Sequence, residues 1–140
     1  MGSVTGTYEH SIDAKGRLFI PAKLREELGA AFYLAMGVDA CLAIYPQESW
    51  DKFTEKFASL PVSQSKGMRS LFANAVKCVP DSQGRIVIPQ RLRDYAGLDK
   101  ETVIIGVHDR AEIWNADRWN ETEEEMTPEK MAALMESLGM

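Results

Sequence analysis

The chain has 140 residues, which fits one ordinary domain or two very small ones and disfavours a multidomain enzyme. Apolar residues make up 45% and charged residues 26%, values typical of a folded globular protein rather than a disordered or disulfide-rich chain. The longest stretch without a formal charge, residues 28–38, is too short to span a bilayer, and the N-terminus lacks a secretory pattern. We therefore expect a cytoplasmic protein that has no membrane partner.

The formal net charge of −5 argues at first against a nucleic-acid partner, but the charge is unevenly distributed. Residues 117–140 hold seven acidic and two basic residues, whereas residues 1–116 hold 14 of each. The body of the chain is therefore neutral, and the whole acidic excess lies in a short C-terminal tail.

The cysteines and histidines form no recognisable reactive site. Cys41 and Cys78 lie in apolar surroundings without Cys-x-x-Cys spacing, so we expect buried, reduced thiols. His10 and His108 have no metal-ligand spacing with these cysteines or with Asp109, and the chain has no phosphate loop or Rossmann glycine pattern. We expect a non-enzymatic protein that needs no metal or cofactor.

An internal repeat organises the chain. Residues 13–29 align without gaps on residues 81–97, with eight of 17 positions identical, and after one inserted residue the match resumes as far as Trp50 and Trp119. Each unit spans about 45 residues, a size at which a β-rich unit buries too little surface to fold alone. The two units should therefore share one core around a pseudo-twofold axis.

Each unit is predicted to contain a short strand, a turn, a second short strand, a short helix and two further strands. The helices begin after Pro21 and Pro89, which stop the preceding strands, and end at Gly29 and Gly97. The strands that follow the turns are expected at residues 17–20, 32–36 and 41–45 of the first unit, and at 85–88, 102–107 and 110–114 of the second.

Three further helices are predicted outside the repeats. Two lie between the units, one with its apolar face at helical spacing from Trp50 to Leu60 and one that carries Met68, Leu71 and Phe72. The third follows Thr127 as N-cap and Pro128 at the first position, with an apolar stripe of Met131, Leu134, Met135 and Leu138.

Both turns have the sequence Asp-x-x-Gly-Arg. In such a turn the carboxylate accepts neighbouring backbone N–H groups, and the glycine supplies a positive φ. The aspartates should therefore hold the turns and orient the arginines, and the pseudo-symmetry should place both motifs on one face. The turn-forming residues are Asp13 and Gly16 before Arg17, and Asp81 and Gly84 before Arg85.

Both repeats form local basic patches that suit DNA. Residues 13–25 carry four bases and one acid, and residues 81–93 carry three bases and one acid. DNA affinity depends on the neutralisation of phosphates, and the arginine fork bridges phosphate oxygens or guanine O6 and N7. We assign the central contacts to Arg17 and Arg85, and a phosphate contact to Lys15, where the second repeat has Gln83. Four helix residues fit a solvated face as well as a DNA contact: Lys23, Arg25, Arg91 and Arg93.

The duplicated motifs resemble the SpoVT-AbrB domain, and two copies in a chain of this length resemble the MraZ family. The resemblance extends over residues 5–125 and includes residues 8–12, 45–46, 95–98 and 112–114. It divides the chain into a first SpoVT-AbrB repeat (residues 5–47), a helical linker (48–75), a second repeat (76–119) and an acidic helical tail (120–140).

The resemblance implies a fold and a function. The fold is mixed β with short helices, a swapped-hairpin, double-psi-like β-barrel built from the two repeats. The function is that of a nucleoid-associated transcriptional regulator, generally a repressor, of the bacterial division and cell-wall gene cluster that includes its own gene. In the family, DNA binding belongs to the Asp-x-x-x-Arg motif, which here is Asp13 with Arg17 and Asp81 with Arg85.

The resemblance also implies rings of about eight or more subunits. One subunit offers few phosphate contacts, so we expect the ring to gain avidity on tandem direct repeats of double-stranded DNA. An alternative from the same superfamily is an AbrB-type antitoxin or protein-interaction module that acts through its C-terminal tail, although two fused repeats favour the regulator.

Overall fold

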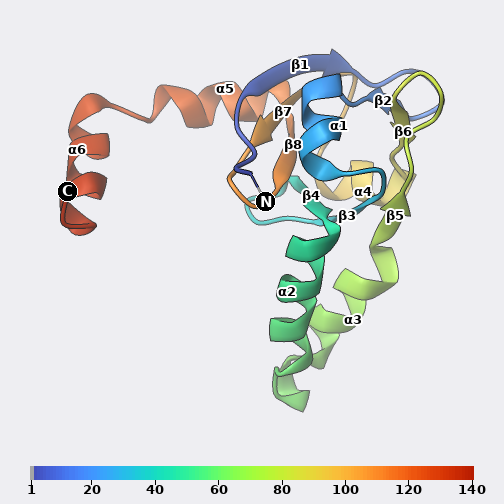
Figure 1. Cartoon of the computed structure of the whole chain (residues 1–140), viewed down its shortest axis with the longest axis horizontal. Coiled ribbons are helices and arrows are strands. Elements are labelled where there is room, and N and C mark those ends of the chain that lie inside the picture. Colours follow the sequence, from blue (N-terminus) through green and yellow to red (C-terminus); the bar gives the residue numbers. More distant parts are fainter. Residues whose placement is uncertain (1) are drawn as a thin grey trace.

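The computed structural model describes residues 2–140, apart from the side chain of Ser65, and it is a mixed α/β structure (Figure 1). The first repeat contains β1 (Thr7–Ser11), β2 (Arg17–Phe19), α1 (Ala22–Leu28), β3 (Phe32–Met36) and β4 (Leu42–Pro46). The second repeat contains β5 (Val76–Cys78), β6 (Arg85–Val87), α4 (Gln90–Tyr95), β7 (Glu101–Gly106) and β8 (Ala111–Asn115). The predicted order of strand, turn, strand, helix and two strands is confirmed in both units.

The linker forms a helical hairpin and the tail forms an extended arm (Figure 1). The hairpin consists of α2 (Gln47–Ala58), the 3-10 turn η1 (Val62–Gln64) and α3 (Ser65–Asn74), which confirms the two predicted linker helices. The arm consists of α5 (Ala116–Glu124) and α6 (Pro128–Ser137), and the Thr127 side chain caps α6 by accepting the Lys130 N–H. Helix α5 was not predicted to begin at Ala116, although Asn115 caps it and it follows β8 as α2 follows β4.

Six strands form one antiparallel sheet in the order β1-β7-β8-β4-β3-β5. The first strand of each repeat pairs with the third strand of the other, as β1 with β7 and β5 with β3. At the centre β4 pairs with β8, where Leu42 lies opposite Ile113. The strand order therefore reads the same when the two repeats are exchanged, and the pseudo-twofold axis passes between β4 and β8.

Strands β2 and β6 form a separate two-stranded antiparallel ribbon, with Leu18 opposite Ile86. Backbone hydrogen bonds from Ile20 to Gly84 (2.9 Å) and from Ile88 to Gly16 (2.8 Å) extend the pairing at both ends. Pro21 and Pro89 follow directly, and a proline has no N–H with which to continue a ladder. Because β2 and β6 pair only with each other, the strands within residues 2–140 do not close into one hydrogen-bonded barrel, which corrects the predicted barrel.

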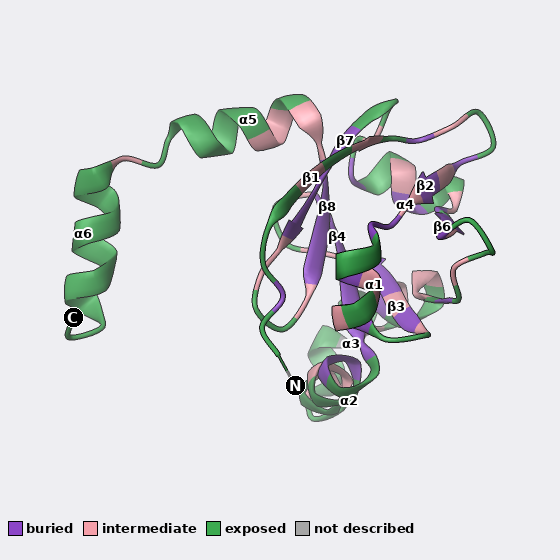
Figure 2. Cartoon of the chain, turned by 45° about the horizontal axis from the view of Figure 1, so that its top comes forward, coloured by how far each residue is buried: buried purple, intermediate pink, exposed green. Residues whose placement is uncertain are grey.

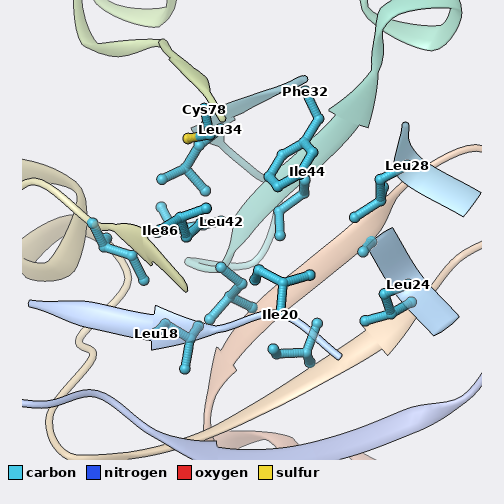
Figure 3. Packing of buried hydrophobic residues seen from close by; sticks show 14 of the residues in the cluster. Leu18, Ile20, Leu24, Leu28, Phe32, Leu34, Leu42, Ile44, Cys78 and Ile86 are labelled. Carbon is cyan, nitrogen blue, oxygen red and sulfur yellow. The ribbon is translucent and has the colours of Figure 1, made fainter. Parts of the chain in front are cut away.

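One hydrophobic core joins the two repeats, as predicted. Leu18 and Ile86 on the inner face of the ribbon pack with residues of the sheet and of α1 and α4 (Figure 3). The largest fully buried side chains come from both units: Leu18, Ile20, Leu24, Leu28, Phe32, Leu34, Leu42 and Ile44 from the first, and Ile88, Leu92, Ile104 and Ile113 from the second.

Two smaller clusters attach the helical hairpin and the arm. In the hairpin, Trp50 is 8% exposed and stacks on Tyr33 of β3 with ring centroids 4.6 Å apart. At the start of the arm, Trp119 of α5 packs edge-on against Trp114 of β8 at 5.4 Å. Both attachments lie on the sheet, so the ribbon of β2 and β6 remains uncovered by them.

The two cysteines are buried and unbridged, as predicted. Burial raises the pKa of the Cys41 thiol to about 12 and that of Cys78 to about 11, so both are thiols at neutral pH. In the part of the chain that the structure describes, no helix is long and apolar enough to cross a membrane.

Alanine at Gly106 is expected to destabilise the fold. A Cβ there would lie 2.4 Å from the Thr5 backbone nitrogen, so the strand end and the N-terminal segment must separate, at a cost of about 1–3 kcal/mol. Gly67 in α3 is the matched control, because a Cβ there meets nothing within 4 Å and alanine should stabilise the helix by about 0.5–1 kcal/mol. Urea unfolding of the two variants would measure this, and equal stabilities would contradict it.

Candidate nucleic-acid interface

The outer surface of the β2–β6 ribbon carries both motif arginines. Side chains alternate between the faces of a strand, so the burial of Leu18 and Ile86 places the flanking residues outward. Arg17 lies opposite Val87, and Phe19 lies opposite Arg85. We call these four residues the ribbon face. The two arginines occupy diagonal positions on it, which confirms the expectation that both motifs share one face.

The first turn is held by the carboxylate of Asp13. Its Oδ1 accepts the backbone N–H groups of Lys15 and Arg17, both at 2.9 Å, and its Oδ2 accepts Nε of Arg17 at 2.6 Å. The Gly16 N–H closes the turn on the Asp13 carbonyl at 3.0 Å, with φ of Gly16 at +78°. Asp13 thus fixes the turn and orients the guanidinium.

The second turn has nearly the same geometry. Asp81 Oδ1 accepts the backbone N–H groups of Gln83 and Arg85 at 2.9 Å each, and its Oδ2 accepts Arg85 Nε at 3.0 Å. Gly84 has φ of +82° and donates to the Asp81 carbonyl at 2.9 Å. The repeated sequence has therefore produced the same hydrogen-bond geometry in both turns.

The motif carboxylates remain charged at neutral pH. The backbone N–H of Arg17 holds the pKa of Asp13 below its usual range, and the backbone N–H of Arg85 does the same for Asp81. Because the carboxylate pKa is lower in the folded state, the charged aspartate stabilises the turn fully at pH values above the ordinary aspartate pKa. This stabilisation is lost only as the pH falls through the lowered pKa. The turns should therefore keep their geometry throughout the neutral range.

The arginine ends are left available for an anion. The side chains of Arg17 and Arg85 are 31% and 28% exposed, and each uses Nε for its aspartate. Among the described residues no hydrogen bond engages Nη1 or Nη2 of either side chain. An arginine that is already oriented loses less rotamer entropy on binding, and its planar end fits a phosphate or the guanine edge.

Arg25 and Arg93 have a structural role that sequence reasoning missed. Arg25 Nε donates to the Ile20 carbonyl at 2.9 Å, and Arg93 Nε donates to the Ile88 carbonyl at 3.0 Å. Each guanidinium also packs on the glycine of the other repeat's turn, where a Cβ would lie 3.0 to 3.1 Å away. The only signal in the sequence was that each follows its motif arginine by eight residues.

The other predicted contact residues flank the ribbon. Lys15 is exposed in the first turn, and Gln83 is its exposed counterpart in the second. Lys23 and Arg91 are exposed at the second positions of α1 and α4, just beyond the strands. The structure thus gathers Arg17, Arg85, Arg25 and Arg93 at the ribbon and leaves three basic side chains around it.

The ribbon face also contains two apolar residues that the sequence analysis did not assign. Val87 is 57% exposed. Phe19 lies under the Arg25 guanidinium at 5.7 Å and against the His10 ring at 5.1 Å. Side chains alternate between the two faces of a strand, so the sequence pattern could have predicted that Phe19 and Val87 lie on the outer face.

The acidic arm lies away from this surface. In Figures 1 and 2 the ribbon and its two turns are on one side of the molecule, and α5 with α6 extend from the other. The six glutamates of residues 121–140 are therefore held away from the ribbon face, where their charge would oppose an anionic ligand.

Comparison with known proteins identifies the family. A family model described as "MraZ protein, putative antitoxin-like" matches residues 4–68 and 71–137. Proteins named "Transcriptional regulator MraZ" are similar over most of the chain. That of Heliobacterium modesticaldum is 46% identical over 126 residues, or 88% of each chain. That of Halothermothrix orenii is 45% identical over 141 positions, which cover 96% of this chain and 98% of the relative. The chain belongs to the MraZ family.

Proposed function

We propose that the protein is a DNA-binding transcriptional regulator that represses the bacterial division and cell-wall gene cluster containing its own gene. The ribbon face carries this proposal, because it presents two oriented arginines whose Nη groups have no partner among the described residues. The names of the relatives, which are transcriptional regulators, support the same reading. The protein would act in the cytoplasm, on the nucleoid.

The ribbon would enter the major groove, which admits a two-stranded β-ribbon. Arg17 and Arg85 would contact phosphate or guanine at two points related by the pseudo-twofold axis, while Asp13 and Asp81 stay behind them as orienting groups. Lys15 has no basic counterpart in the second repeat, where Gln83 stands. The two halves would therefore contact DNA unequally.

We further propose that the repeats are SpoVT-AbrB units in a swapped arrangement, and that the chain assembles into a ring. The exchange of first strands, with β1 on β7 and β5 on β3, supports the swapped arrangement. A ring would present one ribbon face per subunit in the same orientation, which suits tandem direct repeats better than a palindrome.

The proposal predicts specific, salt-dependent binding to the DNA upstream of the protein's own gene. Fluorescence anisotropy at several salt concentrations should give an affinity about 10³-fold or more above that for random DNA of equal length. The log–log salt slope should be about −0.9 per phosphate contacted. Equal affinity for both DNAs at physiological salt would refute a sequence-specific regulator.

The apolar stripe of α6 favours one alternative, an antitoxin-like or protein-interaction module that acts through its tail. All residues of α6 are exposed, so a partner protein could cover it. This function would be supported by a second protein that co-purifies in equal amount with the full chain and not with a chain lacking residues 126–140. If no second protein co-purifies with the full chain, this alternative is rejected.

A further inference from the structure

The C-terminal helix α6 has no partner within its own chain. Every residue of α6 is exposed (Figure 2), yet an apolar stripe runs along one side of it and just beyond. An isolated helix of ten residues is marginal in water, so α6 needs a surface to pack on. The stripe contains Met131, Leu134, Met135 and Leu138, which are 37%, 51%, 44% and 68% exposed.

A groove of about 840 Å³ lies between the α2–α3 hairpin and the sheet. Its walls include aromatic side chains of α2 together with apolar residues of the sheet and α3. We call it the docking groove and define it by its principal apolar lining: Met36, Ala43, Tyr45, Phe53, Phe57 and Leu71. An open apolar groove of this kind is the surface on which an amphipathic helix typically packs.

Charges at the docking groove are complementary to the tail. Lys52 and Lys56 stand one helical turn apart in its lining. Arg110, which also lines it, is already paired with Asp109 at 3.0 Å and with Glu112 at 3.2 Å. Lys52 also pairs with Glu48 at 3.4 Å, so Lys56 is the lysine of the lining that has no ion pair among the described residues. Residues 121–140 carry six acids and one base. The attraction would steer the tail toward the groove.

The arm holds α6 away from the groove of its own chain. At the start of α5, Arg118 donates to the carbonyls of Ala40 at 2.8 Å and Asp39 at 2.7 Å, and Trp119 packs on Trp114. These contacts fix α5 to the sheet, and α6 lies beyond its far end, well separated from α2 and α3 (Figures 1 and 2).

We infer that α6 of one copy of the chain lies in the docking groove of a second copy. The stripe and the groove are different surfaces of one chain, so the contact is head-to-tail, and repetition of such a contact closes a ring when the rotation allows it. This inference rests on the proposed ring assembly and specifies which surfaces build it. The arm then acts as an assembly element rather than as part of the DNA interface.

The first test compares charged substitutions on the two sides of α6. Leu134→Glu places a charge in the stripe, whereas Ala133→Glu places the same charge on the opposite side of the same helix. By analytical ultracentrifugation, Leu134→Glu should reduce the mass to that of smaller species, and Ala133→Glu should keep the wild-type mass. Both variants should keep the cooperative unfolding of the core, because α6 lies outside it, and Leu134→Glu should lose at most the far-ultraviolet signal of one ten-residue helix. A wild-type mass for Leu134→Glu would overturn the inference.

The second test locates the contact by cross-linking. A chain with Leu134→Cys is co-expressed with a longer, tagged chain with Ser70→Cys, since Ser70 lines the docking groove. Mild oxidation should give a disulfide-linked heterodimer, and Ala133→Cys in place of Leu134→Cys should give little. Cys41 and Cys78 are buried and should not compete. Equal yields from the two α6 positions would reject this groove as the docking site.

The tests separate this inference from the proposed function. The chain with Arg17→Ala and Arg85→Ala should retain the wild-type mass, because the ribbon face takes no part in the docking. If the mass of Leu134→Glu is unchanged while DNA binding stands, the docking alone is wrong. If wild-type chains assemble through α6 but show no preference for their own upstream DNA, the proposed function alone is wrong.

Discussion

Replacement of both Arg17 and Arg85 by alanine should weaken DNA binding by at least about 30-fold, since each bidentate arginine contact contributes about 1–3 kcal/mol. The turns should persist, because the Asp13 and Asp81 carboxylates still accept backbone N–H groups. Fluorescence anisotropy at fixed salt measures the affinity, and the log–log salt slope should become shallower by about one unit for each phosphate contact that is lost.

Arg69→Ala is the matched control for this pair. Arg69 is exposed on α3, in the hairpin that projects away from the ribbon, and its loss removes one positive charge (Figure 1). Its affinity should stay close to that of the wild type. If the double variant at Arg17 and Arg85 binds as tightly as Arg69→Ala, the ribbon face is not the DNA-binding surface.

Lysine at the same two positions separates charge from geometry. Arg17→Lys with Arg85→Lys keeps the charge but removes the planar fork and the fixed Nε bond to the aspartates. We expect the salt slope to remain and the preference for the specific site to fall. An equal loss for random and specific DNA would indicate that the arginines contact phosphates only.

The affinity for tandem direct repeats should exceed that for one repeat by about 10²- to 10⁴-fold, because the second contact of a ring on the same DNA is intramolecular. The gain depends on the helical phase of the repeats. Insertion of about five base pairs turns the second repeat to the opposite side of the helix and should remove most of the gain, while about ten base pairs should restore part of it.

Mobility shifts on DNAs of equal length with one repeat, two repeats or two dephased repeats would measure this effect. A DNA of the same length and base composition without repeats gives the non-specific level. Undiminished affinity for a single repeat would contradict the avidity mechanism. Equal binding of the in-phase and dephased DNAs would contradict the fixed geometry of a ring.

Local patterns in the sequence were sufficient for the elements of each repeat. Asp-x-x-Gly-Arg predicted both turns, because aspartate bonding and a positive φ at glycine depend only on neighbouring residues. Pro21 and Pro89 marked the starts of α1 and α4, and Thr127 marked the start of α6. The shared core followed from the size of one unit, which is too small to fold alone.

Tertiary structure decided how the elements combine. No local pattern shows that β1 pairs with β7 and β5 with β3, because pairing partners far apart in the chain are selected by the packing of both halves. Strands β2 and β6 pair only with each other, so no barrel closes among residues 2–140.

The candidate site also has some features that local sequence predicts and others that only the tertiary structure decides. The sequence was enough to predict the two motif arginines, Arg17 and Arg85, because each bonds to an aspartate only four residues earlier in the chain. Their diagonal placement on one face depends on the register that sets Leu18 opposite Ile86. The packing of Arg25 and Arg93 across the repeats and the anchored position of the arm arise only when segments distant in the chain come into contact.

Composition alone showed a net charge of −5, and the fold places the acidic residues that cause it on the side of the molecule opposite the ribbon.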